Sequence, residues 1–332
     1  MKILIIKTSA LGDCLQCFSA LHFLRAHEID WVVEKPFADL LAAHPFINKV
    51  ITIETKKWKK KPFSLESLKE FSAFRSCLRG KQYDLIFDLQ GNIKSGLITA
   101  LSKGKKKVGW TFFKAAEWPS SLFVTHRFAP STNQSVSSQY LEMVQHFFPE
   151  HPSQVSSKIS LTISLEEREF LETSLSKVRG VRFMICMGSN WKNKQLTLST
   201  WKAFLDRVDQ KYTSFFFFVW GSEAEKEEAK IIQKYFSRNS VLLPKMSVPL
   251  WQNMMGKMDL IFSVDSAALH LAATTSTPTF SFFGPSSKKA YLPTGPQHGG
   301  VQGQCPYKKT FQKRCPRLRT CLTAGCLKDI ES

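Results

Sequence analysis

Long hydrophobic runs are missing from this sequence of 332 residues. A membrane-spanning helix needs about 20 consecutive apolar residues, and no stretch approaches that length. The first apolar run ends at Lys7, which leaves it too short for the hydrophobic region of a signal peptide. We therefore expect a cytoplasmic protein without a transmembrane segment.

The familiar phosphate-binding loops are missing from the first expected strand-to-helix turn, KTSALGD at residues 7–13. This turn contains neither GxxxxGK(S/T) nor GxGxxG, the glycine patterns that hold the phosphates of ATP or of a dinucleotide. It therefore gives no support to ATP hydrolysis or to dinucleotide redox chemistry.

Acidic residues are few beside basic ones, 27 against 46, which gives a formal net charge of +19. Such an excess predicts an acidic partner: nucleic acid, anionic lipid or a phosphorylated substrate. A nucleic-acid-binding protein is thus one hypothesis. Against it, the chain has no recognised nucleic-acid motif and its lysines cluster in expected loops, so we expect no nucleic acid as partner.

Close cysteine pairs of the kind that hold structural zinc are few among the four cysteines of the C-terminal tail, although the sequence has eight cysteines in all. One group lies in expected core elements, where we expect reduced thiols: Cys14, Cys17, Cys77 and Cys186. The other group lies in the C-terminal tail: Cys305, Cys315, Cys321 and Cys326. Within this tail group only Cys321 and Cys326 approach metal-ligand spacing, so we expect no metal.

Short apolar runs alternate with helical patterns in both halves of the chain, which predicts an α/β fold with mostly parallel sheets. The expected strands are 3–6, 30–34, 49–53, 83–88, 107–110, 182–187, 214–220, 241–243, 260–264 and 279–283. The clearest helices are 66–78, 93–101, 165–178 and 223–236. A polar segment at 151–164 separates the halves. We expect two Rossmann-like domains, 1–155 and 156–332, facing each other across a cleft.

Asp13 stands at the end of the first strand-to-helix turn. Apolar residues from Leu15 to Leu24 recur every three positions, which predicts a helix there. Ligands of open α/β sheets bind at the carboxyl ends of the strands, where this turn lies. Asp13 is either a helix N-cap, which the spacing favours, or a general base that takes a proton from an attacking hydroxyl.

The stretch from Asp259 to Pro285 carries the most informative turn of the second half. A strand ends at Asp265, and a helix begins at Ser266 and Ala267, whose free N–H groups suit a diphosphate. We expect Asp265 to bind a hydroxyl or to cap the helix. His270 lies among apolar residues and is a core histidine on spacing alone.

Two further groups have competing interpretations. Lys192 and Lys194 follow the first strand of the second half, and they either approach the same diphosphate or are solvated loop lysines. Glu225 either accepts hydrogen bonds from a ribose or is a first-turn acid stabilised by its helix, which the residues alone favour.

Several motifs, in order along nearly the whole chain, resemble the ADP-heptose:lipopolysaccharide heptosyltransferases of glycosyltransferase family 9, and among them heptosyltransferase I. They are KTSALGD at 7–13, WVVE at 31–34, KKWKK at 56–60, YDLIFDLQGNIKSGL at 83–97, WG at 220–221, LPKMS at 243–247, SVDSAALHLAA at 263–273 and FGPSS at 283–287. The resemblance implies a GT-B fold and an inverting transfer without metal or cofactor.

The resemblance also implies site residues. Asp13 is the expected catalytic base, and Lys194 is expected to stabilise the leaving diphosphate. The expected donor site comprises Ser189, Asn190, Lys194, Glu225, Met246, Asp265, Ser266, Ala267 and His270. The expected acceptor site comprises Ser9, Gly12, Lys57, Lys59, Lys60 and Gln90. The chain departs from the family at Ala267, where glycine is usual, and at Ala116, where arginine is usual.

The function implied is transfer of heptose from ADP-heptose to a Kdo residue of Kdo-lipid A in the lipopolysaccharide inner core. The alternative within the class is heptosyltransferase II or another sugar-nucleotide transferase. The lysines around Trp58 are either a solvated loop or a surface that binds an anionic lipid acceptor. With that acceptor, we expect peripheral contact with the cytoplasmic face of the inner membrane.

Overall fold

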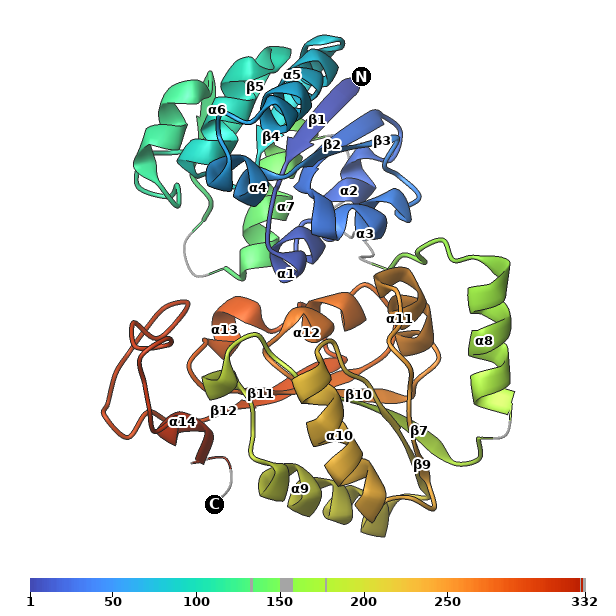
Figure 1. Cartoon of the computed structure of the whole chain (residues 1–332). Helices are drawn as coiled ribbons and strands as arrows, with labels where there is room; N and C mark the ends of the chain where they lie inside the picture. The colour runs from blue at the N-terminus through green and yellow to red at the C-terminus, as the bar shows by residue number, and fades with distance from the viewer. Residues whose placement is uncertain (132–133, 150–157, 177, 329, 331–332) are drawn as a thin grey trace. The chain divides into compact units, whose positions relative to one another are not determined.

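The computed structural model describes residues 1–131, 134–149, 158–176, 178–328 and 330. The chain divides into two compact units (Figure 1). Unit 1 comprises Met1–Thr132 and Ser138–Ser156, and unit 2 comprises Asn133–Ser137 and Ser157–Ser332. The domain boundary expected at 155–156 lies outside the described residues. Within the described residues, no helix has the length and apolar character needed to cross a bilayer.

Unit 1 is built on a six-stranded parallel sheet in the order β3-β2-β1-β4-β5-β6. Its strands are β1 Lys2–Ile6, β2 Glu28–Glu34, β3 Lys49–Ile53, β4 Gln82–Asp88, β5 Lys103–Trp110 and β6 His126–Phe128. The central strand β1 is almost wholly buried, which explains its continuous apolar run. Because β1 and β4 are neighbours, the loops that follow them meet at one edge of the sheet.

Helices cover the unit 1 sheet. They are α1 Leu11–Leu15, α2 Phe18–Leu24, α3 Ala38–Ala42, α4 Thr55–Lys60, α5 Leu65–Arg79, α6 Ile93–Leu101 and α7 Val136–Phe147, with short 3-10 turns η1 Lys35–Phe37 and η2 Trp118–Phe123. Helices α5 and α6 lie on one face of the sheet (Figure 1). Their residues Phe74, Leu78 and Ile98 join the strand residues Leu4 and Ile86 in one apolar core.

Unit 2 repeats this plan with the parallel order β12-β11-β10-β7-β8-β9. Its strands are β7 Val181–Cys186, β8 Ser214–Phe218, β9 Ser240–Leu242, β10 Leu260–Val264, β11 Thr279–Phe283 and β12 His298–Gln302. Its helices are α8 Leu165–Ser176, α9 Leu198–Lys211, α10 Glu223–Tyr235, α11 Val248–Met255, α12 Ala267–Ala272, α13 Lys288–Tyr291 and α14 Gly325–Lys328, with η3 Lys192–Lys194. Trp201 of α9 is fully buried and packs edge-on against Phe282 of β11.

The structure confirms the α/β class, the parallel sheets and the expected strands, three of which have the predicted bounds: β3, β10 and β11. Helix α8 begins with a capping box, in which the Ser164 N–H donates to the Glu167 carboxylate at 3.0 Å and the Glu167 N–H donates to the Ser164 hydroxyl at 3.1 Å. The single helix expected from Leu15 is wrong, since α1 ends at Leu15 and α2 begins at Phe18. Part of the expected linker, 151–157, lies outside the described residues.

Candidate active site

Asp13 is the third residue of α1, directly beyond the carboxyl end of β1. One of its carboxylate oxygens accepts a hydrogen bond from the backbone N–H of Ala10 at 3.1 Å, so Asp13 caps the first turn from inside the helix. The N-cap position itself belongs to Ala10. A carboxylate has about four acceptor positions, so this bond leaves Asp13 able to receive a proton.

Gln90 ties the end of β4 to the same turn. Its side-chain oxygen accepts hydrogen bonds from the backbone N–H groups of Thr8 at 3.1 Å and Ser9 at 3.3 Å. Gly12 precedes Asp13 within α1. The structure therefore brings four of the expected unit 1 residues to one edge of the sheet, around the β1–α1 turn: Ser9, Gly12, Asp13 and Gln90.

Lys7 is a buried cation beneath this turn that the sequence interpretation missed. Its Nζ donates a hydrogen bond to the Tyr140 hydroxyl at 2.7 Å and to the Leu89 carbonyl at 3.3 Å. Burial by itself lowers the pKa of Lys7, but interactions with Tyr140, Cys17 and Asp13 hold that pKa above its ordinary value. The turn therefore lies over a lysine whose Nζ is held by two hydrogen bonds.

Asp88, also missed, shapes the loop that carries Gln90. This buried carboxylate accepts hydrogen bonds from the N–H groups of Gln90 at 3.0 Å and Gly91 at 2.9 Å, and from the Ser95 hydroxyl at 2.9 Å. Burial raises the pKa of Asp88 to about 6, although these hydrogen bonds oppose the shift. Asp88 thereby fixes the position of Gln90 relative to α6.

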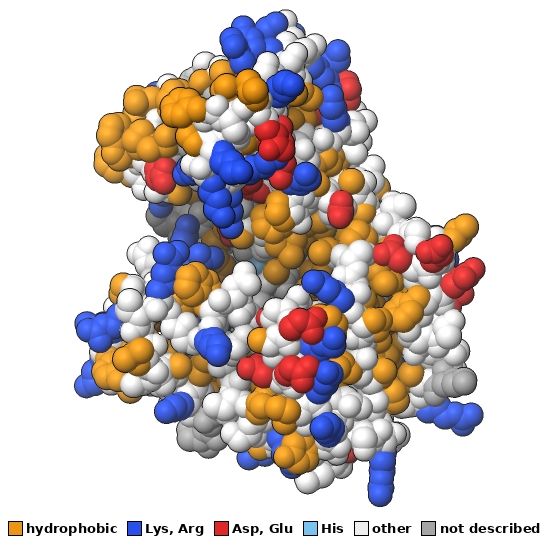
Figure 2. Space-filling model, viewed as in Figure 1, with side chains coloured by type: hydrophobic (Ala, Val, Ile, Leu, Met, Phe, Trp, Pro, Cys, Tyr) orange, Lys and Arg blue, Asp and Glu red, His pale blue; other side chains and the backbone are white. Residues whose placement is uncertain are grey.

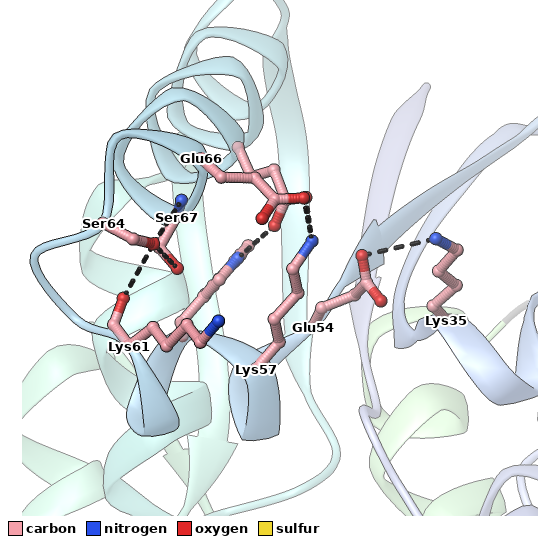
Figure 3. Close-up of polar contacts among 9 residues, drawn as sticks. Lys35, Glu54, Lys57, Lys61, Ser64, Glu66 and Ser67 are labelled. Atoms are coloured by element: carbon pink, nitrogen blue, oxygen red, sulfur yellow. Dashed lines mark hydrogen bonds and ion pairs between the residues drawn. The ribbon is translucent and has the colours of Figure 1, made fainter.

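The lysine-rich run lies in helix α4, which corrects the expectation of a loop. Lys57 is already engaged, because its Nζ lies 2.8 Å from Glu66 and 2.6 Å from Glu70, both on α5 (Figure 3). Lys59 and Lys60 are exposed. Of the three lysines expected to bind the acceptor, two thus present open charges and one is neutralised.

Lys194 and Asp265 form a buried ion pair in unit 2. They follow β7 and β10, which are neighbours in the sheet, and Lys194 Nζ lies 2.5 Å from Asp265 Oδ2. Burial by itself raises the pKa of Asp265, but Lys194 and His270 hold it below its ordinary value. Lys194 is therefore not a solvated loop lysine, and Asp265 is a partner for a cation rather than a helix cap.

Three further expected donor residues lie beside this pair. Ser266 occupies the N-cap position of α12 and Ala267 its first turn. The Ser266 hydroxyl is buried and makes no hydrogen bond within the described structure. His270 is buried, and its Nε2 lies 3.9 Å from Asp265 Oδ1. The cluster thus combines a lysine, an imidazole and a hydroxyl that makes no hydrogen bond within the described structure.

The remaining expected donor residues follow other strands of the same sheet, Glu225 in the first turn of α10 and the others on loops. Glu225 closes a capping box by accepting the Gly221 N–H at 2.7 Å and the Ser222 N–H at 3.1 Å, the structural role favoured by the residues alone. A Cβ placed on Gly188 would come within 2.4 Å of this carboxylate, so Glu225 lies against the loop after β7. That loop carries Ser189 and the exposed Asn190, whereas Met246 follows β9.

The four tail cysteines line one small cavity of about 20 Å³. All eight cysteines are free thiols. Burial is the main cause that raises the pKa of Cys326 to about 11. Within the residues that the structure describes, no three histidine, cysteine or acidic side chains are placed to hold a metal ion.

Solved structures define the class of protein. The structure described as Escherichia coli heptosyltransferase WaaC with ADP superposes with a TM-score of 0.78 at 24% identity, covering 99% of this chain and 98% of that one. The same enzyme with ADP-2-deoxy-2-fluoro heptose gives 0.75 at 25% identity, with the same coverage. The fold is GT-B, two Rossmann-like units in one chain.

Sequence comparison gives the family. Residues 71–320 match glycosyltransferase family 9 (heptosyltransferase), and the chain belongs to this family of glycosyltransferases. Lipopolysaccharide heptosyltransferase 1 of Escherichia coli O18:K1:H7 is 28% identical over 291 residues, which is 86% of each chain. The resemblance drawn from the motifs is therefore confirmed.

Proposed function

We propose that the protein transfers heptose from ADP-heptose to Kdo of a Kdo-lipid A acceptor, with inversion at the anomeric carbon. Family membership and the heptosyltransferase 1 relative support this reaction. The observation that carries the mechanism is the position of Asp13 at the carboxyl edge of the unit 1 sheet, with acceptor capacity to spare. No metal or cofactor takes part; ADP-heptose is the donor substrate.

In this mechanism Asp13 takes the proton from the acceptor hydroxyl while the hydroxyl oxygen attacks the anomeric carbon. The bond from that carbon to the ADP oxygen breaks through an oxocarbenium-like state, by analogy with inverting glycosidases. Negative charge then grows on the diphosphate. Lys194 and the Ser266 hydroxyl stabilise this charge, as preorganised donors do in a buried site.

The acceptor supplies a reason for the basic surface. Kdo carboxylates and lipid A phosphates are anionic, and the exposed Lys59 and Lys60 are free to attract them. We place the enzyme at the cytoplasmic face of the inner membrane as a peripheral protein. Nucleic acid has no part in this proposal.

Replacing Asp13 tests the proposal. Asp13→Asn keeps an oxygen for the Ala10 N–H but removes the base, so we expect transfer to fall at least about 100-fold. ADP affinity, measured by calorimetry, should stay at the wild-type value, because the expected donor residues lie in unit 2. Wild-type turnover by Asp13→Asn and Asp13→Ala would refute the mechanism.

The substrates need a separate test. A panel of sugar nucleotides is assayed with Kdo-lipid A and with heptosylated acceptors. We expect ADP-heptose with Kdo-lipid A to react fastest. Faster transfer to a heptosylated acceptor, or from another sugar nucleotide, would assign the alternative within the class.

A further inference from the structure

Exposed apolar side chains are concentrated in one part of unit 1. Among its described residues, the large exposed hydrophobic side chains other than Met1 all fall between Phe63 and Leu122. Six of them come from α6 and from the segment after β5, and together we call them the apolar face: Ile93, Leu97, Phe112, Phe113, Trp118 and Leu122. Figure 2 shows hydrophobic side chains gathered over this end of unit 1.

The apolar face belongs to a fixed structure. Glu117, the residue before η2, makes two hydrogen bonds: its N–H donates to the Gly91 carbonyl in the loop before α6 at 2.9 Å, and its carboxylate accepts from the Ile93 N–H of α6 at 2.8 Å. Gly96 of α6 packs so closely on η2 that an added Cβ would lie 2.6 Å from Phe123. Phe113 is nevertheless 97% exposed and Trp118 61% exposed. Large apolar side chains gathered in water on one part of a surface indicate a binding surface.

Positive charge adjoins further exposed apolar residues in the neighbouring helices. Helix α4 is held to α5 by Lys57 and by the Trp58 indole, which donates to Glu70 at 2.9 Å. The exposed lysines Lys59, Lys60 and Lys61 are followed, after Pro62, by Phe63, which is 89% exposed, and then by the exposed Leu65. Within the described part of the chain, these three lysines form no ion pair with a carboxylate.

We propose that the apolar face enters the headgroup region of an anionic bilayer while the α4 lysines contact lipid phosphates; the biological setting rests on the proposed function. Aromatic rings favour the interface between lipid and water, and nearby lysines are attracted to anionic leaflets. Apolar insertion together with basic charge is the combination by which proteins lie on membranes.

Vesicle sedimentation tests the proposal on the full chain. The probe vesicles contain phosphatidylglycerol and phosphatidylcholine in equal parts, or phosphatidylcholine alone, without lipopolysaccharide. The test variant is Phe113→Ser/Trp118→Ser/Leu122→Ser. The control is Leu165→Ser/Leu322→Ser, which removes two highly exposed leucines of unit 2. A third variant, Lys59→Gln/Lys60→Gln/Lys61→Gln, removes charge only.

We expect wild type and the leucine control to bind the anionic vesicles, and the aromatic variant to bind at least about tenfold more weakly. The lysine variant should also bind more weakly and lose most of its salt dependence. The proposal would be overturned if the aromatic variant bound vesicles as well as wild type does. It would also be overturned if light scattering showed that wild type self-associates and that the aromatic variant loses this self-association while it still binds vesicles. Unchanged thermal unfolding verifies that the variants fold.

A transfer assay separates this proposal from the proposed function. The acceptor is a Kdo-bearing disaccharide without acyl chains, which needs no membrane. The aromatic variant should transfer heptose to it at the wild-type rate while failing to sediment with vesicles. If wild type binds vesicles but transfers no heptose, the proposed reaction is refuted and the proposed membrane-binding surface is still supported.

Discussion

Among single residues, Lys194 has a structural role and a proposed catalytic role, and the two roles compete for the same ammonium group. It neutralises the buried carboxylate of Asp265, and in the proposed reaction it must also stabilise a diphosphate. A buried ion pair is costly to break from one side, because the remaining charge is left without a partner. Structural and catalytic effects of Lys194 must therefore be measured separately.

We expect Lys194→Met to destabilise unit 2 by about 3 kcal/mol or more, because the buried Asp265 then loses the lysine that lies 2.5 Å from its carboxylate. The double variant Lys194→Met/Asp265→Leu should regain most of that stability, yet its ADP affinity should stay low. Urea unfolding and calorimetry provide the two measurements. A double variant that binds ADP like wild type would show that Lys194 does not contact the diphosphate.

His44 predicts an acid-sensitive unit 1. Its ring packs on Phe18 with centroids 4.6 Å apart, and its Nδ1 accepts the Phe46 N–H at 3.1 Å. Burial, with a smaller contribution from His22, lowers the pKa of His44 to about 3. Below pH 6.5, His44 is therefore protonated in the unfolded chain but stays neutral in the folded chain. The free energy of unfolding falls as pH falls.

The slope from this one residue is at most about 1.4 kcal/mol per pH unit between pH 6.5 and pH 4. His44→Asn can still accept the Phe46 N–H, as asparagine does in turns, but it does not titrate. We expect its free energy of unfolding to vary less with pH than that of wild type. Parallel curves for the two proteins would contradict this assignment.

Among the elements, the contact between α6 and η2 allows a test of packing. A methyl group on Gly96 would lie 2.6 Å from Phe123 and 3.1 Å from the Ser120 Cα, so one element must move. We expect Gly96→Ala to lower the free energy of unfolding by about 1–3 kcal/mol. Gly256→Ala is the control, because its Cβ would lie at an ordinary 3.4 Å from its nearest neighbour. Equal effects would show that α6 and η2 separate easily.

Elements with strong apolar patterns could be predicted from the sequence, and weak ones could not. Strands β3, β10 and β11 were predicted with their observed bounds, whereas β6, which has three mostly polar residues, and β12, which contains two glycines, were not predicted. Helix α4 was missed because four of its six residues are lysines; contacts with Glu66 and Glu70 on α5 hold it. For α7, Val136, Tyr140 and Met143 at helical spacing were available as a signal.

The candidate site shows the same division. Asp13 and Asp265 could be placed at strand ends because both follow apolar runs that only a central strand explains. The Lys194–Asp265 ion pair could not be predicted from the sequence, because 70 residues separate Lys194 from Asp265 and only the pairing of β7 with β10 brings them together. The contact between Lys7 and Tyr140 likewise depends on α7 packing against unit 1.

For the whole molecule, two separate cores predict that a ligand of one unit protects that unit first. ADP at about 100 times its dissociation constant adds about 2.7 kcal/mol to the state that binds it. Hydrogen exchange should therefore slow in β7, β10 and α12 and much less in β1, β2 and β4. Greater protection in unit 1 would move the nucleotide site to that unit.

Because all the described strands of both sheets pair in parallel, neither sheet contains a hairpin. Each pairing must close a loop long enough to hold a crossover connection, and the central pair β1–β4 closes one that contains β2 and β3. Contacts far apart along the chain must thus form before the sheets gain stability, which makes folding slow. Until the sheets form, the apolar strands of a newly synthesised chain are unpaired and exposed to water, so the chain can aggregate through them.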